Sequence, residues 1–355
     1  MSDIKKKGSI QWSKYAQLIV PAVAILLIIV FNLIRDPSFF SVEITQNNDG
    51  NNVLSGNLVS IFNGASELAV LAMGMTLVTA ACGGQDISVG ALAAIAGSVF
   101  VKVLKSGASI SIGTIILGFI ACCAVAVIFG TFNGTLVSVF RIQPMIATLV
   151  LYTCGRSVAY WINGGATPTV SSPLITALGG FIPGIPVPTP ILIVIVVAVL
   201  FSLLFRFTSL GIYTQSVGIN QRAARLNGIN TVFIKLLTFM ILGACCAVAG
   251  VIAVSRLSLI NHETPLLEIE MDAILAVAIG GNALSGGKFR LSGSIIGAYA
   301  IQALTTTLYA MKVPSTDIKA YKAVVIILIV VIGSPVVKQK LSALWQKLSP
   351  GKAVA

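Results

Sequence analysis

Long apolar stretches, separated by short polar segments, run through almost the whole chain. A helix that crosses a bilayer needs about 20 mostly apolar residues, within a range of about 17 to 25. We expect ten membrane spans, at residues 15–34, 58–81, 86–104, 110–139, 144–162, 188–206, 232–255, 271–285, 292–310 and 321–337. The stretch 271–285 is short for a crossing, and the glycine-rich junctions at 82–90 and 280–293 are candidates for re-entrant segments.

The composition agrees with this pattern. Of the 355 residues, 56% are hydrophobic and 10% are charged, whereas an ordinary soluble domain carries about 25% charged residues. The mean hydropathy is +0.98. These values exclude a soluble enzyme, a nucleic-acid-binding domain, a secreted disulfide scaffold and a disordered chain. The sequence therefore predicts an all-α polytopic membrane protein that has the lipid bilayer, and no nucleic acid, as a partner.

The distribution of charge predicts the orientation, because Lys and Arg accumulate in short cytoplasmic loops. With the N-terminus inside, most of the 23 Lys and Arg lie on the inner side and most of the 11 Asp and Glu lie outside. Both ends are then cytoplasmic, which requires an even number of spans. The expected layout is a membrane domain at 15–337, with cytoplasmic tails at 1–14 and 338–355.

Two of the expected outer segments have a distinct composition. Residues 36–57 are polar and rich in Asn, so we expect a solvated loop. Residues 163–190 contain six prolines, which prevent a membrane helix but are compatible with a stiff loop. This second loop is either a docking surface or a simple connection.

The largest expected inner loop, about 207–231, contains a short helix at 220–228. Asn220 can cap the start of this helix, and Gly228 can supply the left-handed residue that ends it. Because helices of fewer than about 12 residues are marginal alone, this one needs a packing partner.

The composition of this short helix suggests what its partner is like. Ala223 and Ala224 are small enough to allow close approach, and Arg222 and Arg225 are suited to acidic groups or lipid phosphates. An ordinary positively charged inner loop explains the same residues equally well.

Four stretches resemble the sugar permeases of ABC importers of the ribose/galactose type. They are Gly218 to Asn230 (GINQRAARLNGIN), Gly83 to Gly90 (GGQDISVG), Asp272 to Gly281 (DAILAVAIGG) and Arg141 to Leu149 (RIQPMIATL). The similarity extends over residues 58–333. It is greatest to galactofuranose-type permeases, including the contexts of Gly287-Lys288-Phe289 and Ile301-Gln302.

The resemblance implies a subunit that transports a monosaccharide through a dimeric pore, formed with a second copy or a paralogue, in the inner membrane of a bacterium. An extracytoplasmic sugar-binding protein would deliver the sugar, and separate ATPase subunits would bind ATP and Mg. The chain itself would hold no cofactor and no catalytic residue. The residues expected to couple it to the ATPase are Asn220, Arg222, Ala223, Ala224, Arg225, Gly228 and Ile229.

The segments Gly83–Gly90 and Gly280–Gly287 share the pattern G-G-x-x-x-S-x-G. Irregular backbone at membrane depth is tolerated only where it is buried in protein or lines a wet cavity. The two segments are therefore either hinges near an inner gate or tight turns between spans. The candidate pathway or gate residues are Gln85, Asp86, Gln143 and Asn282. Gln85 departs from the family pattern, which usually has Ile at this position.

Charged residues within the spans have to be paired, capping or hydrated. Asp86 either caps the start of the third span or lines the transport path. Glu67 and Asp272 lie near the expected outer ends of their spans. Arg156 is expected to reach the interface or to pair with Glu67.

Other chemistry is poorly supported. Residues 281–289 superficially resemble a phosphate-binding loop, but Phe289 follows Lys288 where Ser or Thr is required. The six cysteines lie in apolar stretches without metal-ligand spacing, and His262 is the only histidine. We therefore predict no metal site and no enzyme. An ion-coupled secondary transporter is the alternative, with Asp86 as its only evident coupling carboxylate.

Overall fold

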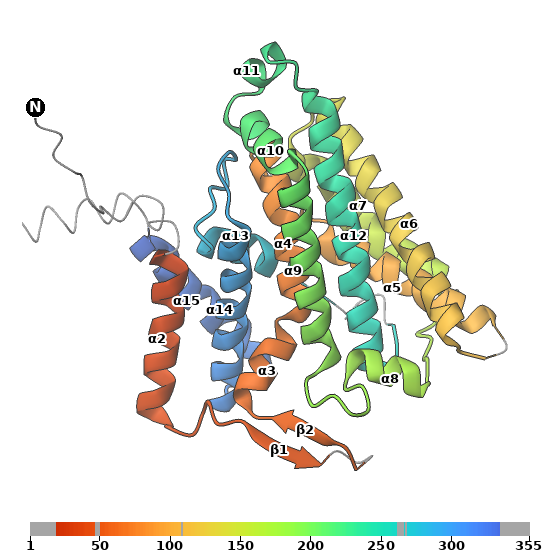
Figure 1. The fold of residues 1–355 in the computed structure, drawn as a ribbon, viewed down its shortest axis with the longest axis vertical. Helices are drawn as coiled ribbons and strands as arrows, with labels where there is room; N and C mark the ends of the chain where they lie inside the picture. Colours follow the sequence, from red (N-terminus) through yellow and green to blue (C-terminus); the bar gives the residue numbers. More distant parts are fainter. Residues whose placement is uncertain (1–18, 47–49, 108, 261–265, 267, 334–355) are drawn as a thin grey trace, which may run out of the picture.

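The computed structural model describes residues 19–46, 50–107, 109–260, 266 and 268–333, and most of them are helical (Figure 1). The elements are α2 (Ile19–Arg35), β1 (Glu43–Gln46), β2 (Asn52–Ser55), α3 (Asn57–Gly64), α4 (Ser66–Cys82), α5 (Val89–Ser106), α6 (Ile112–Ser138), α7 (Pro144–Ile162), α8 (Pro173–Gly179), α9 (Thr189–Phe207), α10 (Leu210–Ile219), α11 (Gln221–Leu226), α12 (Thr231–Leu257), α13 (Ile269–Ile279), α14 (Leu291–Ala310) and α15 (Ser315–Gly333).

Several of these helices can cross a membrane. Within the described residues, α5, α6, α7, α9 and α12 are each long and apolar enough, and α3 with α4, which meet at an angle of 41°, is either a sixth, broken span or a re-entrant segment. The chain is therefore a mostly helical, multi-pass membrane protein. The other predicted spans, and the placement of both ends in the cytoplasm, stay predictions. The tails at 1–14 and 338–355 lie outside the described residues.

The expectation of a full span at 271–285 is wrong. Helix α13 has 11 residues, or about 16 Å at 1.5 Å per residue, whereas the hydrocarbon core is about 30 Å thick. The helix stops at Ile279 because Gly280 and Gly281 follow, and Gly281 adopts a left-handed φ of 79°. Apolar residues continue beyond the two glycines, so the sequence pattern predicted a helix longer than α13.

The prediction of an all-α chain with a plain loop at 36–57 needs correction, because β1 and β2 form an antiparallel hairpin. The backbone N–H of Leu54 also donates to the carbonyl of Pro186 at 2.9 Å, which joins the hairpin to the proline-rich segment. That segment has no membrane helix and contains only the short α8. Val170 N–H donates to Ser258 O at 2.8 Å and holds the segment against the end of α12.

The core of the protein is built around α4 and α12. Every residue from Ser66 to Ala81 is buried, as expected for a helix that is surrounded by others. Glycines on α12 let its neighbours approach closely, since a Cβ at Gly243 or Gly250 would overlap carbonyl oxygens of α6 and α5. These central helices provide a rigid frame for the more irregular segments.

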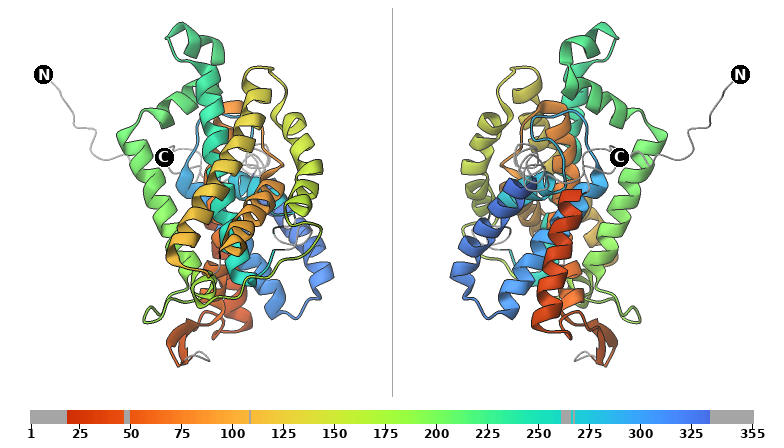
Figure 2. Two further views of the ribbon diagram at one scale, coloured as in Figure 1. Left: turned by 90° about the vertical axis from the view of Figure 1, so that its right-hand side faces the viewer. Right: turned by 90° about the vertical axis from the view of Figure 1, so that its left-hand side faces the viewer.

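The two ends of the molecule differ. Helices α10 and α11 project at one end, and the β1–β2 hairpin covers the other (Figures 1 and 2). Arg222 and Arg225 lie on α11. Because basic residues favour the cytoplasmic side, we take the α10–α11 end as the inner end.

Candidate functional site

The short helix expected at 220–228 is present as α11, although it ends at Leu226. The side chain of Asn220 accepts hydrogen bonds from the backbone N–H groups of Arg222 and Ala223, each at 3.0 Å. At the other end, Gly228 has a φ of 80°. Its N–H donates to Arg225 O, and the next N–H donates to the carbonyl of residue 224, as in a Schellman motif. The predicted cap and stop are therefore confirmed.

Helix α10, which the sequence reading treated as loop, packs against α11 and α12 and makes them one unit. Leu210, Val217, Ala224 and Ile234 form a small buried cluster between these three helices. The unit composed of α10, α11 and the first turns of α12 is called the inner arm below. Its own core supplies the packing partner that a six-residue helix requires.

Polar contacts strengthen the inner arm. The hydroxyl oxygen of Thr231, at the start of α12, accepts hydrogen bonds from Gln221 Nε2 at 3.2 Å and Arg225 Nε at 2.9 Å. Of the expected coupling residues, Ala224 is buried in the arm, whereas Arg222 and Ala223 are exposed. Leu226 beside them is 90% exposed. The outer surface of α11 is therefore open, and its inner surface is fixed to the arm.

The two glycine-rich segments lie directly against each other at the base of the inner arm. Gln85 Nε2 donates to Leu284 O at 3.2 Å, and Gly287 N–H donates to Ala80 O at 2.9 Å. A Cβ at Gly83 would come within 2.7 Å of a carbonyl oxygen in the second segment. We call this contact between 80–88 and 280–290 the inner junction. The sequence pattern that the two segments share does not by itself predict a contact between them.

The last turn of α10 packs directly against the inner junction. A Cβ at Gly218 would overlap both the carbonyl oxygen of Ala80 and the amide nitrogen of Gly287. The neighbouring Ile219 side chain lies against Gly287, at 3.1 Å from where a Cβ would stand. The inner arm therefore touches both breaks, through the backbone at Gly218 and through the side chain of Ile219.

Asp86 is buried in the first break. Its Oδ1 accepts hydrogen bonds from the backbone N–H of Ser88 at 2.7 Å and from the Ser88 hydroxyl at 2.6 Å. Asn133 on α6 donates to the same two side chains, at 3.4 Å to Asp86 and 2.9 Å to Ser88. The carboxylate thus orders the turn that precedes α5, although its bond is to Ser88 and not to the first turn of the helix.

Asn282 holds the second break in a similar way. Its Nδ2 donates to the Arg290 carbonyl at 3.1 Å and to the Ser294 hydroxyl at 2.7 Å, and its Oδ1 accepts from Arg290 N–H at 2.6 Å. Ser294 continues this network to Thr76 on α4 at 2.6 Å. Gln143 is exposed at the start of α7, next to Pro144, which packs against Gly84 in the first break.

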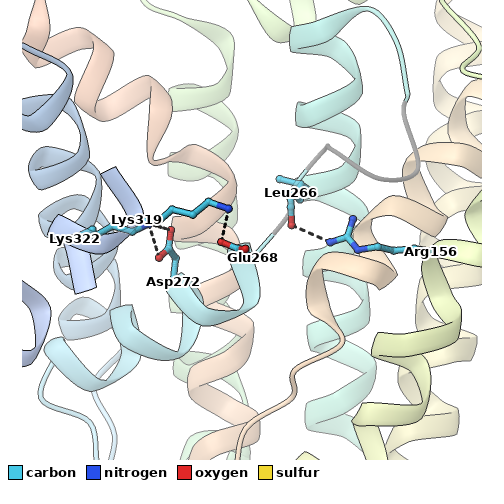
Figure 3. Close-up of polar contacts among 6 residues, drawn as sticks. All are labelled: Arg156, Leu266, Glu268, Asp272, Lys319 and Lys322. Atoms are coloured by element: carbon cyan, nitrogen blue, oxygen red, sulfur yellow. Dashed lines mark hydrogen bonds and ion pairs between the residues drawn. The ribbon is translucent and has the colours of Figure 1, made fainter. Parts of the chain in front are cut away.

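A second polar region surrounds the start of α13 (Figure 3). Lys322 Nζ binds both carboxylate oxygens of Asp272, at 2.8 and 2.7 Å, and Lys319 Nζ binds Glu268 Oε2 at 2.7 Å. We call these two ion pairs the α13–α15 charge cluster. Asp272 therefore has a lysine partner on another helix, which was not among the predicted pairs.

The backbone before α13 has unusual geometry. Leu266 and Glu268 adopt left-handed φ values of 59° and 64°, which non-glycine residues adopt rarely. Arg156 Nη2 donates to Leu266 O at 3.4 Å. Of the two alternatives for Arg156, the pairing with Glu67 is wrong, because Glu67 pairs with Arg256 at 3.1 Å.

The Lys322–Asp272 pair of this cluster lies well inside α15 and not in its first turn. Lys322 comes seven residues after the start of α15, or about 10 Å along the helix. Charges at this depth face protein or water, because lipid solvates them poorly. A sequence signal existed: three acids occur within 268–272, and two lysines are three residues apart at the start of an apolar stretch.

No metal site accompanies these residues. Among the residues that the structure describes, no group of three or more His, Cys, Asp or Glu side chains could hold a metal ion. All six cysteines are free thiols.

Comparison with known proteins identifies the family. Residues 57–333 match the family model described as the permease component of branched-chain amino acid transport systems. The chain belongs to this permease family. This permease is 38% identical over 316 residues to the galactofuranose transporter permease of Escherichia coli K12, with 88% of each chain covered.

Other relatives carry different sugars in their names. The permease is 34% identical to the fructose import permease of Bifidobacterium longum, over 88% of this chain and 86% of the relative. It is also 34% identical to the ribose import permease of Escherichia coli K12, over 87% of this chain and 91% of the relative. No solved structure matches the permease.

Proposed function

We propose that this permease is the membrane-spanning subunit of an ATP-driven importer of a monosaccharide in a bacterial inner membrane. The observation that carries the proposal is the similarity, over nearly nine-tenths of both chains, to a permease named for galactofuranose transport. Relatives named for fructose and ribose import support the class of solute and leave the individual sugar open.

The proposal assigns ATP and Mg to separate cytoplasmic ATPase subunits, which dock on the exposed surface of α11. Arg222 and Ala223 belong to that surface, while Ala224 and Ile229 fix α11 to the rest of the inner arm. An external binding protein delivers the sugar at the hairpin end, and a second permease copy or paralogue completes the pore. The chain itself performs no catalysis.

In this mechanism, a movement of the ATPase subunits displaces the whole inner arm. The displacement passes from Gly218 to Ala80 and Gly287, because these backbones are already in contact. Gln85, Asp86 and Asn282 hold the two breaks and thereby set how the inner junction opens. Alternating access then follows from the movement of a few broken segments against a rigid frame.

The test is co-purification from the native membrane. A tagged full-length permease is solubilised in a mild detergent, and the accompanying proteins are identified and quantified. The proposal predicts a nucleotide-binding subunit in roughly one-to-one ratio with the permease. A permease that purifies without any such subunit, and that moves solute under an ion gradient, would contradict it.

A further inference from the structure

A cavity of about 360 Å³ opens at the inner end, between the α6–α7 turn and the inner arm. Arg141 from the turn, Arg222 and Arg225 from α11, and Lys235 from α12 all line it. Cys82, the last residue of α4, lines it as well, so the cavity lies beside the inner junction.

The four cations around this cavity have no counter-ion. No carboxylate lines the cavity, and within the described part of the chain none of the four takes part in an ion pair. Two of them bond to neutral groups instead: Arg225 to Thr231 at 2.9 Å and Lys235 to Gln221 at 3.3 Å. Like charges gathered around one space repel each other, and a bound anion would remove that repulsion.

A buried hydroxyl beside the same cavity is also without a partner among the described residues. Ser138 lines the cavity and is 3% exposed. Its hydroxyl has no hydrogen-bond partner among the described residues, although buried hydroxyls almost always have one. It can donate to an oxygen of a bound anion.

The general excess of positive charge on the inner side does not explain this arrangement. Arg206 and Lys288 also lie toward the inner end, and neither lines the cavity. A phosphate group carries up to two charges and several acceptor oxygens, and it matches arginine side chains and a donating hydroxyl. We propose that this cavity binds a phosphate group, carried either by the headgroup of an anionic phospholipid or by a soluble phosphoester.

Binding there would join two parts of the molecule. Arg141 belongs to the turn between two long helices, whereas Arg222 and Arg225 belong to the inner arm. A phosphate between them would restrain the arm against the frame and so regulate its coupling movement. This regulatory consequence rests on the proposed function, but the binding itself does not.

The first experiment uses the full-length protein in a neutral detergent. Its thermal unfolding midpoint is followed as inorganic phosphate is added, with sodium chloride at equal ionic strength as the reference. The midpoint should rise with phosphate beyond the chloride reference, because a ligand that binds only the folded state stabilises it. In Arg141→Gln/Lys235→Gln the apparent dissociation constant should increase by about tenfold or more.

Two further variants separate the site from general charge effects. Arg206→Gln/Lys288→Gln removes the same charge outside the cavity and should keep wild-type phosphate binding. Ser138→Ala should weaken phosphate binding by a smaller factor without loss of folded protein. Equal phosphate responses in the two double variants would overturn a soluble-phosphate site.

A second experiment distinguishes a lipid headgroup from a soluble phosphoester. The protein is placed in nanodiscs of phosphatidylcholine with or without phosphatidylglycerol, and retained lipid is counted by native mass spectrometry. Phosphatidylglycerol retained by the wild type and lost from the Arg141→Gln/Lys235→Gln variant indicates a headgroup site, whereas a response to inorganic phosphate alone indicates a soluble phosphoester. If neither probe separates the cavity variant from its charge-matched control, the proposal fails, and the ATPase association remains a separate result.

Discussion

At the inner junction, the breaks after α4 and α13 touch through glycine backbone atoms, whereas the segment before α13 is flanked by ion pairs from α15. A backbone contact such as Gly218 against Ala80 leaves no room for a side chain and transmits displacement directly. The Lys322–Asp272 pair, at 2.7 Å, can separate if water reaches it. The comparison suggests a stiff inner linkage and a more adjustable polar region toward the outer side.

The strongest way to break the inner linkage is Gly218→Val. The added side chain would overlap backbone atoms of both breaks, and overpacking of this kind costs about 1–3 kcal/mol or more. We expect a large fall in folded yield, measured by fluorescence-detected size exclusion, and no sugar uptake. Gly211→Val on the same helix is the control, because its Cβ would meet only Phe205 at 3.5 Å. Similar folded yields for Gly218→Val and Gly211→Val would contradict the close contact of Gly218 with Ala80 and Gly287.

A bulky residue on the exposed side of the arm should act on coupling alone. We expect Ala223→Trp to keep insertion and folding but to uncouple ATP hydrolysis from uptake, because Ala223 is exposed at the expected docking surface. A bulky residue at Gly228 should also uncouple, since it strains the left-handed end of α11. Uptake and hydrolysis are measured in the same vesicles. Ile212→Trp, exposed on α10, is the control, and normal coupling in Ala223→Trp would remove the docking assignment.

The substitution Asp86→Asn tests whether Asp86 stabilises the first break or lines the transport path. The amide oxygen can still accept both bonds from Ser88, but the amide NH2 would face the donating Nδ2 of Asn133, so we expect a loss of about 1–3 kcal/mol in stability. Folded yield should fall more than sugar preference changes. Wild-type yield combined with altered sugar selection would instead make Asp86 a pathway residue.

The smallest expected effects concern the α13–α15 charge cluster. A double-mutant cycle of Asp272→Asn and Lys322→Gln should give a coupling of about 1 kcal/mol, read from unfolding midpoints in detergent. Lys319 and Glu268 are 59% and 51% exposed, so their cycle should give less, within about 0.2–1 kcal/mol. A larger coupling energy for Lys319–Glu268 than for Lys322–Asp272 would show that the cluster is arranged differently in the folded protein.

Local features were predictable from the sequence where the determinants lie a few residues apart. The Asn220 cap and the Gly228 stop of α11 depend on contacts within one or two turns, and both are present. The multi-pass helical class follows from composition alone. The family was also identified correctly, because its motifs are spread over most of the chain.

Features that depend on distant partners were not predictable in the same way. The contact between 80–88 and 280–290 joins segments about 200 residues apart, and nothing local indicates it. Lys322 looked like the edge of a span until Asp272 was placed beside it. Helix α10 was not predicted within the expected inner loop at 207–231, because the packing of Leu210 and Val217 that supports it involves residues of other helices.

The most direct test of the account is transport by the reconstituted complex. The permease, the co-purified ATPase subunits and the binding protein are placed in proteoliposomes, and uptake of labelled galactofuranose, fructose and ribose is measured with ATP or with an ion gradient. The account predicts uptake of at least one sugar that requires ATP and persists when ion gradients are collapsed. Uptake by the permease alone, driven by an ion gradient and indifferent to ATP, would contradict it.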